Sequence, residues 1–323
     1  MTIAYACDEN YAGLTAISAT SVLQSNPGAR IVLLGFRLHE EAKELVRTRV
    51  ESAGGTFLYR DVSPAIDRLE KQGVCPYTSY AAYARIFIAD VLEEDGRILY
   101  LDCDTLVTDS LDDLFEIDLD GKPFALGFDC IALAYKRYIH HPSNLPYYNT
   151  GSMLIDLPTW RSHRCTDRIL AELEHPSGPN PLGDQDVIVR VFPQETRPLE
   201  PKWNFLSQFF MLSYRGVRRI VGERSHLLFS PEAYAEARQR AAICHFSGQT
   251  LGRPWFTSSR HPMRERYRAV ALSADLAAVA EQTRPMPFEY KVQYWLYRIL
   301  PQRLFDVACW LMYRMHIRLT YKV

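Results

Sequence analysis

The sequence predicts an α/β domain built on a mostly parallel, doubly wound central sheet. Three short apolar runs, at residues 3–6, 31–36 and 56–59, have the length and continuity of buried strands. Helical patterns at residues 11–24 and 39–52 separate them, so strand and helix alternate as in right-handed βαβ units. Ligands bind such sheets beyond the carboxyl ends of the strands, so functional side chains are expected there.

Later elements have weaker local signals. Residues 97–101 form another buried-strand run, and residues 124–127 predict a further strand. Beyond them the strand signals fade. Residues 147–151 and 176–181 are rich in turn-forming side chains and are expected to be loops.

Composition and charge exclude several classes of protein. Of the 323 residues 47% are hydrophobic, which is enough for a substantial core and excludes intrinsic disorder as the main state. Lys plus Arg total 37 and Asp plus Glu 38, so there is no general attraction to nucleic acid, and any basic site must be local. We expect one main domain over residues 1–270 and a separate segment over residues 271–323.

Signals of cellular location favour the cytoplasm. The seven cysteines are odd in number and include no Cys-x-x-Cys pair, so a reducing compartment is the simplest setting. The first residues lack a basic region, and Asp8 interrupts the apolar run, which argues against a signal peptide. No window reaches the roughly 18 uninterrupted apolar residues of a membrane-spanning helix.

The C-terminal segment differs in kind from the rest. Between residues 290 and 323 six basic side chains accompany one acid, Asp306, so the local charge is about +5. Pro301 divides the segment into two helical patterns, each with apolar residues on one side bordered by Arg or Lys, as in helices that lie in a bilayer interface. We expect this segment to associate with a membrane surface, or else to cap the domain or contact a partner subunit. Its basic residues are Lys291, Arg298, Arg303, Arg314, Arg318 and Lys322, and its aromatic residues include Tyr294, Trp295, Tyr297, Phe305, Trp310, Tyr313 and Tyr321.

Two carboxylates follow the strand at residues 97–101. Asp102 and Asp104 leave the sheet edge together, so their oxygens can converge on a hard cation such as Mg²⁺ or Mn²⁺ that bridges a diphosphate. A lone Asp-x-Asp is common by chance and can be a solvated turn, but the preceding apolar run favours a site.

The segment Tyr100-Leu101-Asp102-Cys103-Asp104 resembles the Asp-x-Asp motif of glycosyltransferase family 8, the retaining GT-A enzymes that include glycogenin and bacterial lipooligosaccharide α-galactosyltransferases. Further blocks are similar to those of the family in the same order, and together they span residues 3–255. The resemblance implies a Rossmann-like, nucleotide-sugar-binding GT-A domain. The further blocks are residues 6–11, Tyr83-Ala84-Arg85, residues 148–156, Asp184-Gln185-Asp186, and His245-Phe246-Ser247-Gly248 with Arg253-Pro254-Trp255.

The resemblance also implies roles for individual residues. A cation, Mn²⁺ or Mg²⁺, would stabilise charge on the departing diphosphate, while fixed carboxylates and amides would discriminate sugar epimers. The metal ligands would be Asp102, Asp104 and His245. Residues for donor binding would be Ala6, Asp8, Asn10, Arg85, Asp102, Cys103, Asp104, Gly248 and Arg253. Sugar recognition and catalysis would fall to Asp129, Asn149, Asp184 and Gln185.

Each of these residues also has a structural interpretation. His245 could be a packed core histidine, Gly248 an ordinary turn residue, and Asp129 a cap. The chain departs from the family after Gly248, because Arg253 stands, after about two extra residues, where the family has a lysine. A guanidinium can also pair with phosphate.

The family resemblance implies that the anomeric configuration of the transferred sugar is retained. Retention can proceed by a front-face, ion-pair-like displacement or through a covalent intermediate. Gln185 stands where the family would place a nucleophile, and an amide is a poor one. We therefore favour the front-face route, and an adduct on Gln185 or Asp184 would argue against it.

The sequence does not identify the acceptor. Pro76, Tyr77, Thr78 and Tyr80 stand where members of the family differ, and aromatic rings there could stack on a sugar face or pack a loop.

Two other functions fit part of the sequence. Residues 98–107 also resemble the Asp-x-Asp-x-Thr signature of haloacid-dehalogenase phosphatases, but nearly a hundred residues of α/β chain precede Asp102 and the other blocks would have no role. A membrane-bound scaffold that keeps the fold without activity is the second alternative.

The sequence as a whole predicts a metal-dependent, retaining hexosyltransferase that uses UDP-galactose or UDP-glucose. We expect it at the inner face of the cell membrane, with residues 290–323 on the membrane surface, acting on a lipid-linked saccharide such as a lipopolysaccharide core or capsule precursor. No nucleic-acid partner is expected.

Overall fold

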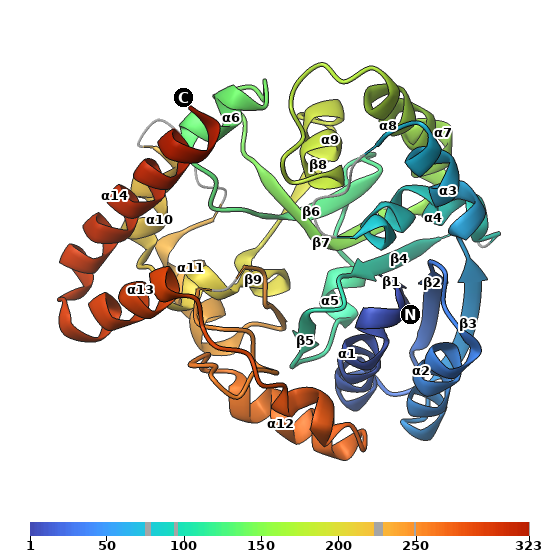
Figure 1. Cartoon of the computed structure of the whole chain (residues 1–323). Coiled ribbons are helices and arrows are strands. Elements are labelled where there is room, and N and C mark those ends of the chain that lie inside the picture. Colours follow the sequence, from blue (N-terminus) through green and yellow to red (C-terminus); the bar gives the residue numbers. More distant parts are fainter. Residues whose placement is uncertain (75–78, 94–95, 223–228, 249, 323) are drawn as a thin grey trace.

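The computed structural model describes residues 1–323 except 75–78, 94–95, 223–228, 249 and 323. Among the described residues, seven strands form a central sheet in the order β3-β2-β1-β4-β7-β6-β8 (Figure 1). The first four strands are parallel, β7 runs antiparallel to β4 and β6, and β8 is parallel to β6. The predicted mostly parallel α/β sheet is therefore confirmed. The strands are β1 (Thr2–Cys7), β2 (Arg30–Gly35), β3 (Thr56–Asp61), β4 (Arg97–Leu101), β6 (Phe124–Phe128), β7 (Tyr148–Asp156) and β8 (Thr196–Leu199).

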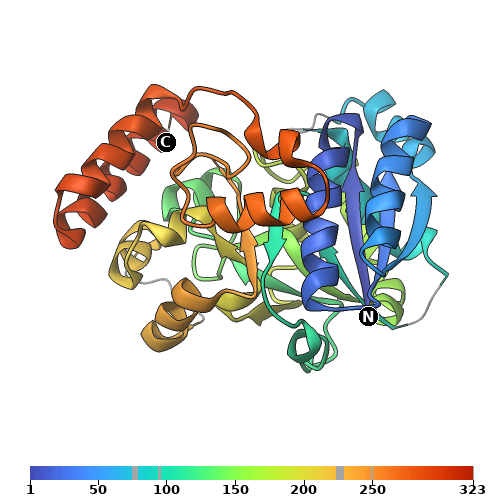
Figure 2. The ribbon, with the colours of Figure 1, turned by 90° about the horizontal axis from the view of Figure 1, so that it is seen from below.

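Both faces of this sheet are covered by helices. Ile3 and Tyr5 of β1 belong to a core cluster shared with α1 and α2, whereas Ala4 and Ala6 belong to a second cluster on the side of α3. This alternation explains why the strands read as continuous apolar runs. Figure 2 shows α1 and α2 side by side along one end of the molecule. The α-helices are α1 (Ala12–Ser25), α2 (Glu40–Ser52), α3 (Ser63–Lys71), α4 (Ile88–Val91), α5 (Asp112–Phe115), α6 (Leu133–Tyr138), α7 (Leu157–Ser162), α8 (Cys165–Glu174), α9 (Asp184–Val191), α10 (Tyr214–Val221), α11 (Pro231–Arg240), α12 (Arg264–Ser273), α13 (Phe288–Ile299) and α14 (Gln302–Tyr321). The 3-10 helices are η1 (Glu9–Tyr11), η2 (Tyr80–Phe87), η3 (Pro201–Trp203), η4 (Ser207–Phe210) and η5 (Ala277–Glu281).

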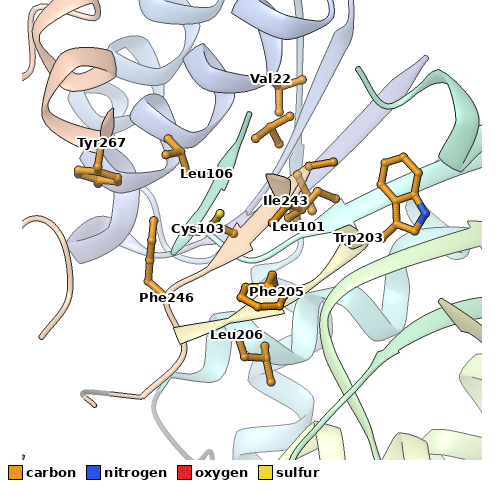
Figure 3. Close-up of a cluster of buried hydrophobic side chains, with 14 of the residues drawn as sticks. Val22, Leu101, Cys103, Leu106, Trp203, Phe205, Leu206, Ile243, Phe246 and Tyr267 are labelled. Carbon is orange, nitrogen blue, oxygen red and sulfur yellow. The ribbon is translucent and has the colours of Figure 1, made fainter. Parts of the chain in front are cut away.

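A second, smaller sheet carries later parts of the chain back to the end of β4. It has the order β5-β10-β9, with β10 antiparallel to β5 and parallel to β9. Leu106, Phe205 and Ile243 from its three strands pack in one core with Val22 of α1 and Leu101 of β4 (Figure 3). This packing fixes the end of β10 beside the end of β4. The strands are β5 (Thr105–Val107), β9 (Phe205–Leu206) and β10 (Ile243–His245).

The prediction of a loop at residues 147–151 is wrong. Residues Tyr148–Asp156 form β7, which has pairing partners on both sides and is buried along nearly its whole length. Instead of making a turn, Asn149 lines the cleft described below and Gly151 lies against His245 and Asp102. The pairing register with β6 shifts between Leu126 and Gly127. The second predicted loop, at residues 176–181, contains no helix or strand.

The C-terminal segment forms two helices, α13 and α14, divided at Pro301 as predicted. They lie at the end of the molecule opposite α2 and α3, and α14 packs against α10 and α6 (Figures 1 and 2). No helix in the described part of the chain is both long and apolar enough to cross a membrane. Residue 270 falls inside α12, and the division into domains 1–270 and 271–323 stays a prediction.

Candidate active site

A cleft of about 390 Å³ lies at the carboxyl ends of β1 and β4, where a sheet of this kind binds ligands. All of the candidate site residues except Asn10 line it. Asn10 is exposed, and its backbone N–H donates to Asp8 Oδ1 at 3.0 Å. The lining includes Ala6, Asp8, Arg85, Asp102, Cys103, Asp104, Asp129, Asn149, Asp184, Gln185, His245, Gly248 and Arg253.

Two carboxylates and an imidazole form a cluster at the centre of the cleft. Asp102, Asp104 and His245 each offer a ligand atom, and these atoms lie within 4.8 Å of one another. His245 Nε2 is 3.2 Å from Asp104 Oδ1 and 3.7 Å from Asp102 Oδ2. The register of β10 with β5 pairs His245 with Thr105, which brings the histidine next to the end of β4. Such a donor set suits Mn²⁺ or Mg²⁺.

The cluster needs a glycine beside it. A Cβ on Gly151 of β7 would lie 2.1 Å from His245 Cε1 and 2.6 Å from Asp102 Oδ2. The Gly151 carbonyl also accepts the backbone N–H of Asp102 at 2.8 Å, which fixes the point where the chain leaves β4. The close approach of these groups therefore depends on the missing side chain.

Asn204, which follows η3, orients the histidine. Its Oδ1 lies 3.1 Å from His245 Nδ1, and its Nδ2 donates to Asn149 Oδ1 at 2.9 Å. Because the amide oxygen can only accept, Nδ1 carries the proton and the lone pair of a neutral imidazole is on Nε2, facing the carboxylates. Nothing in the sequence around Asn204 indicates this role.

The charges in the cluster stabilise one another. Burial alone would raise the pKa of Asp104, but the neighbouring His245 and Arg253 outweigh it and hold the pKa well below its usual range. Burial would lower the pKa of His245, and Asp104 and Asp102 outweigh it, so that pKa is raised. Asp104 therefore stays ionised as a cation ligand must.

Arg85 is fully engaged inside the protein. Its guanidinium donates to Thr150 O at 2.6 Å and Asp102 Oδ1 at 2.9 Å. Its Nε hydrogen goes to the Ala82 carbonyl, so the 2.9 Å contact with Asp184 Oδ2 is an ion pair without a hydrogen bond. Burial outweighs this ion pair and raises the pKa of Asp184 to about 6. Arg85 thus holds two carboxylates of the site in place.

A network of amides and one carboxylate occupies another part of the cleft. Asn149 Nδ2 donates to Asp129 Oδ2 at 3.2 Å and to Gln185 Oε1 at 3.0 Å, and Gln185 Nε2 donates to the Tyr147 hydroxyl at 3.1 Å. Burial raises the pKa of Asp129. Gln208 of η4, which sequence reasoning missed, donates to Asp129 Oδ1 at 3.3 Å. Several donors and acceptors at fixed positions can recognise sugar hydroxyls.

The remaining predicted residues lie nearer the end of β1. Ser79 donates from its hydroxyl to Asp8 Oδ2. The Cys103 thiol donates to Ala6 O at 3.1 Å and accepts from the Thr15 hydroxyl, so it points into the protein.

Arg253 lies near both Gly248 and the carboxylate cluster. Its Nε donates to the Gly248 carbonyl at 3.4 Å, and its NH1 is 3.5 Å from Asp104 Oδ2. The insertion that separates these two residues in the sequence therefore does not separate them in space.

Of the predicted acceptor residues, Pro76, Tyr77 and Thr78 lie outside the described residues. Tyr80 begins η2, packs 6.2 Å from the Phe36 ring, and does not line the cleft.

The mostly parallel sheet, with its cleft at the carboxyl ends of β1 and β4, has the arrangement of the GT-A class of fold. A family model described as Glycosyl transferase family 8 matches residues 2–259. The chain belongs to glycosyltransferase family 8. This confirms the resemblance seen in the sequence and sets the phosphatase alternative aside.

Known proteins similar to the chain include bacterial glycosyltransferases. General stress protein A of Bacillus subtilis is 26% identical over 276 residues, covering 83% of this chain and 91% of the relative. Lipopolysaccharide 1,3-galactosyltransferase of Salmonella typhimurium is 24% identical over 275 residues, covering 82% and 76%. Glycosyltransferase GlyF of Streptococcus pneumoniae is 29% identical over 204 residues, covering 63% of this chain and 48%, about half, of GlyF.

The fold is also found in a solved structure of the galactosyltransferase LgtC in complex with donor and acceptor sugar analogs. The match has a TM-score of 0.68 at 23% identity and covers 90% of this chain and 99% of that chain. At this identity the likeness establishes the GT-A fold, with its mostly parallel sheet.

Proposed function

We propose that this chain is a retaining hexosyltransferase that moves galactose or glucose from a UDP-sugar to a saccharide acceptor. The observation that supports this most directly is the convergence of Asp102, Asp104 and His245 with the amide network of Asp129 and Gln185 in one cleft of a family 8 protein. Mn²⁺ or Mg²⁺ bound by the three ligands would stabilise the charge that develops on the departing diphosphate.

The chain's own residues divide the remaining work. Arg253, whose Nε donates to the Gly248 carbonyl, would pair with the phosphates. The end of β1, with Ala6 and Asp8, would bind the nucleoside. Asp129 and Gln185, together with their hydrogen-bonded partners, would hold the sugar hydroxyls so that the wrong epimer leaves polar groups unpaired.

Retention would follow the front-face route. The Gln185 amide is hydrogen-bonded on both sides: Nε2 donates to the Tyr147 hydroxyl, and Oε1 accepts from Asn149. An amide oxygen that already accepts a hydrogen bond is an even poorer nucleophile. This supports a route in which the UDP leaves and the acceptor attacks on the same face of the sugar. Mass spectrometry of protein quenched during turnover tests this, because a glycosyl adduct on Gln185 or Asp184 would contradict it.

The acceptor would be a lipid-linked surface glycan, reached from the cytoplasmic face of the membrane. The relative from Salmonella typhimurium is a lipopolysaccharide galactosyltransferase. Among the residues that the structure describes, the exposed large hydrophobic side chains other than Met1 and Leu272 gather on α13 and α14, among arginines and lysines. This surface, Phe288, Trp295, Ile299, Leu304, Leu311, Met315 and Leu319, is called the apolar stripe below.

The test is UDP release from a panel of UDP-sugars with and without Mn²⁺. We expect turnover of one UDP-hexose that depends on the cation and is lost in Asp104→Ala. Asp113→Ala removes an exposed carboxylate on α5 and should keep wild-type turnover. Silence of the wild type across the whole panel, with metal and acceptors present, would favour the inactive scaffold.

A further inference from the structure

α14 is fixed to the catalytic part of the molecule through a buried carboxylate. Asp306, 2% exposed, accepts from the backbone N–H and the hydroxyl of Ser213 and from Gln302 Nε2 at 2.9 Å. Gln302 Nε2 also donates to the Met211 carbonyl at 2.9 Å. A Cβ on Gly216 of α10 would lie 2.5 Å from Asp306 Oδ1, so the absence of a side chain at this position leaves room for the carboxylate. The start of α14 therefore has one defined position.

The other end of α14 is fixed as well. The Tyr321 ring packs 5.3 Å from that of Tyr135 and 4.9 Å from that of Tyr138 of α6. The Tyr135 hydroxyl donates to Asp186 Oδ2 at 2.9 Å, and Asp186 lies in α9 next to Gln185 of the sugar-binding network. The C-terminal helix thus touches the elements that hold this network.

Tyr313 lies between these two anchors and lines the cleft that contains the metal cluster. Burial raises the pKa of Tyr313, and the neighbouring Cys130 and Asp129 raise it further. A hydrogen bond with the backbone of Ala132 lowers it in part. The hydrogen bond with Ala132, which follows Asp129 by three residues, and the shared lining of the cleft put the Tyr313 ring at the Asp129 end of the cleft, where Gln208 is also found. None of the residues assigned to the donor contributes an aromatic ring here.

The chemistry of this position suits a second saccharide. An aromatic ring offers a flat apolar face and, in tyrosine, a polar tip, which matches the C–H face and hydroxyls of a sugar. If Asp129 and Gln185 hold the transferred hexose, a ring that lines the same cleft without contacting the donor offers a surface for the acceptor. The same helix, α14, exposes four residues of the apolar stripe: Leu304, Leu311, Met315 and Leu319.

We propose that Tyr313 forms part of the acceptor subsite, stacking on the saccharide acceptor, so that the C-terminal helix is a wall of the active site. This rests on the proposed function, since the acceptor has meaning only for a glycosyl transfer. α14 would then contribute both to the acceptor subsite, through Tyr313, and to the apolar stripe, through its exposed residues.

The experiment measures UDP release from UDP-galactose and UDP-glucose with Mn²⁺ and no vesicles. UDP release without an acceptor measures hydrolysis of the donor. Methyl β-galactoside, methyl β-glucoside, lactose and maltose are then added one at a time. The saccharide that accelerates UDP release by the wild type most is used as the probe. In Tyr313→Ala we expect the KM for the probe to rise about tenfold or more, with donor KM and hydrolysis within about twofold of wild type. Tyr313→Phe keeps the ring and should keep the wild-type KM.

Two further variants separate stacking from folding and from membrane contact. Asp306→Ala loosens α14 and should raise the same KM, whereas Leu311→Ser, on the exposed side of the helix, should leave it unchanged. An unchanged KM in Tyr313→Ala overturns the proposal, and so does an equal loss of hydrolysis and transfer. A wild type that hydrolyses the donor but is accelerated by no saccharide in the panel also overturns it. A wild type that releases no UDP refutes the proposed function itself.

Discussion

A single hydrogen bond decides which nitrogen of His245 faces the two carboxylates. Asn204 Oδ1 accepts a hydrogen bond from Nδ1–H, and without this acceptor the ring would be free to rotate or to change its tautomer. Asn204 also donates to Asn149, so one side chain links the cluster of Asp102, Asp104 and His245 to the hydrogen-bonded network of Asn149 and Gln185. The two halves of the site are therefore coupled through residues that need not touch any ligand.

Asn204→Ala should weaken Mn²⁺ binding by about 10–100-fold, because the ring would lose its fixed orientation. Titration of Mn²⁺ in the presence of UDP, followed by the electron paramagnetic resonance signal of the free ion, measures this. Asn144→Ala, an exposed amide in another loop, is the control. Wild-type affinity in Asn204→Ala would show that the hydrogen bond does not position the ligand.

A second histidine predicts how stability depends on pH. His261 is buried between the rings of Phe210 and Phe246, each 4.9 Å away, and its Nδ1 accepts the backbone N–H of Met263. Burial lowers its pKa to about 3, below the value of about 6.5 in the unfolded chain. The unfolded state therefore binds the proton first, and the free energy of unfolding falls as the pH falls below about 6.5.

Between pH 7 and pH 5, His261 should lower the free energy of unfolding by about 2 kcal/mol. Asn at position 261 can still accept from Met263 but does not titrate, so His261→Asn should lose less stability over the same range. Urea unfolding of both proteins at pH 7 and pH 5 gives the difference. Equal losses in the two proteins would mean that His261 does not contribute to the acid sensitivity.

At the scale of elements, the contact between α10 and α14 joins the C-terminal segment to the catalytic part. It combines a buried carboxylate, a backbone N–H at the start of α10 and a glycine that leaves room for the carboxylate. An isolated amphipathic helix gains little stability by itself, so α14 depends on this packing for its position.

Gly216→Ala should therefore loosen α14 and cost about 1–3 kcal/mol through overpacking. Hydrogen exchange measured by mass spectrometry should show faster exchange in residues 302–321 and unchanged exchange in β1 and β2. The double variant Gly216→Ala/Asp306→Ala lacks the clash and should exchange no faster than Asp306→Ala alone. Fast exchange spread evenly over the whole protein would contradict a local contact.

Over the whole molecule, the N-terminal half of the sheet is predictable because its strands are buried on both faces and separated by regular helices. β7 is not predictable in this way. Its Asn149 lines the cleft, its Gly151 makes room for Asp102 and His245, and its partners β4 and β6 come from earlier parts of the chain. Asp102, Asp104 and His245, the candidate metal ligands, could be predicted from sequence motifs, and the structure brings these three side chains together. Gln208 and Tyr313, which line the cleft, and Asn204, which contacts His245, could not be predicted, because they lie outside any motif and only the tertiary fold brings them to the site.

The distribution of charge over the whole molecule leads to the last prediction. The chain has a formal charge of −1, but residues 290–323 carry about +5 at one end, around the apolar stripe. Binding to a membrane should then combine two contributions: apolar insertion, which does not depend on lipid charge, and attraction to anionic lipid of about 1 kcal/mol for each basic residue near the surface. Salt should weaken only the second.

Co-flotation with vesicles separates the two contributions. Arg314→Gln/Arg318→Gln should weaken binding to phosphatidylglycerol vesicles by up to about 30-fold and leave the weaker binding to phosphatidylcholine unchanged. Leu311→Ser/Leu319→Ser should weaken both, while Arg68→Gln, on α3 at the other end of the molecule, should change neither (Figure 1). Because these side chains are exposed and outside the cleft, donor hydrolysis should be the same in every variant. If both double variants float like the wild type, the stripe faces a protein partner or solvent and the membrane is approached, if at all, by another surface.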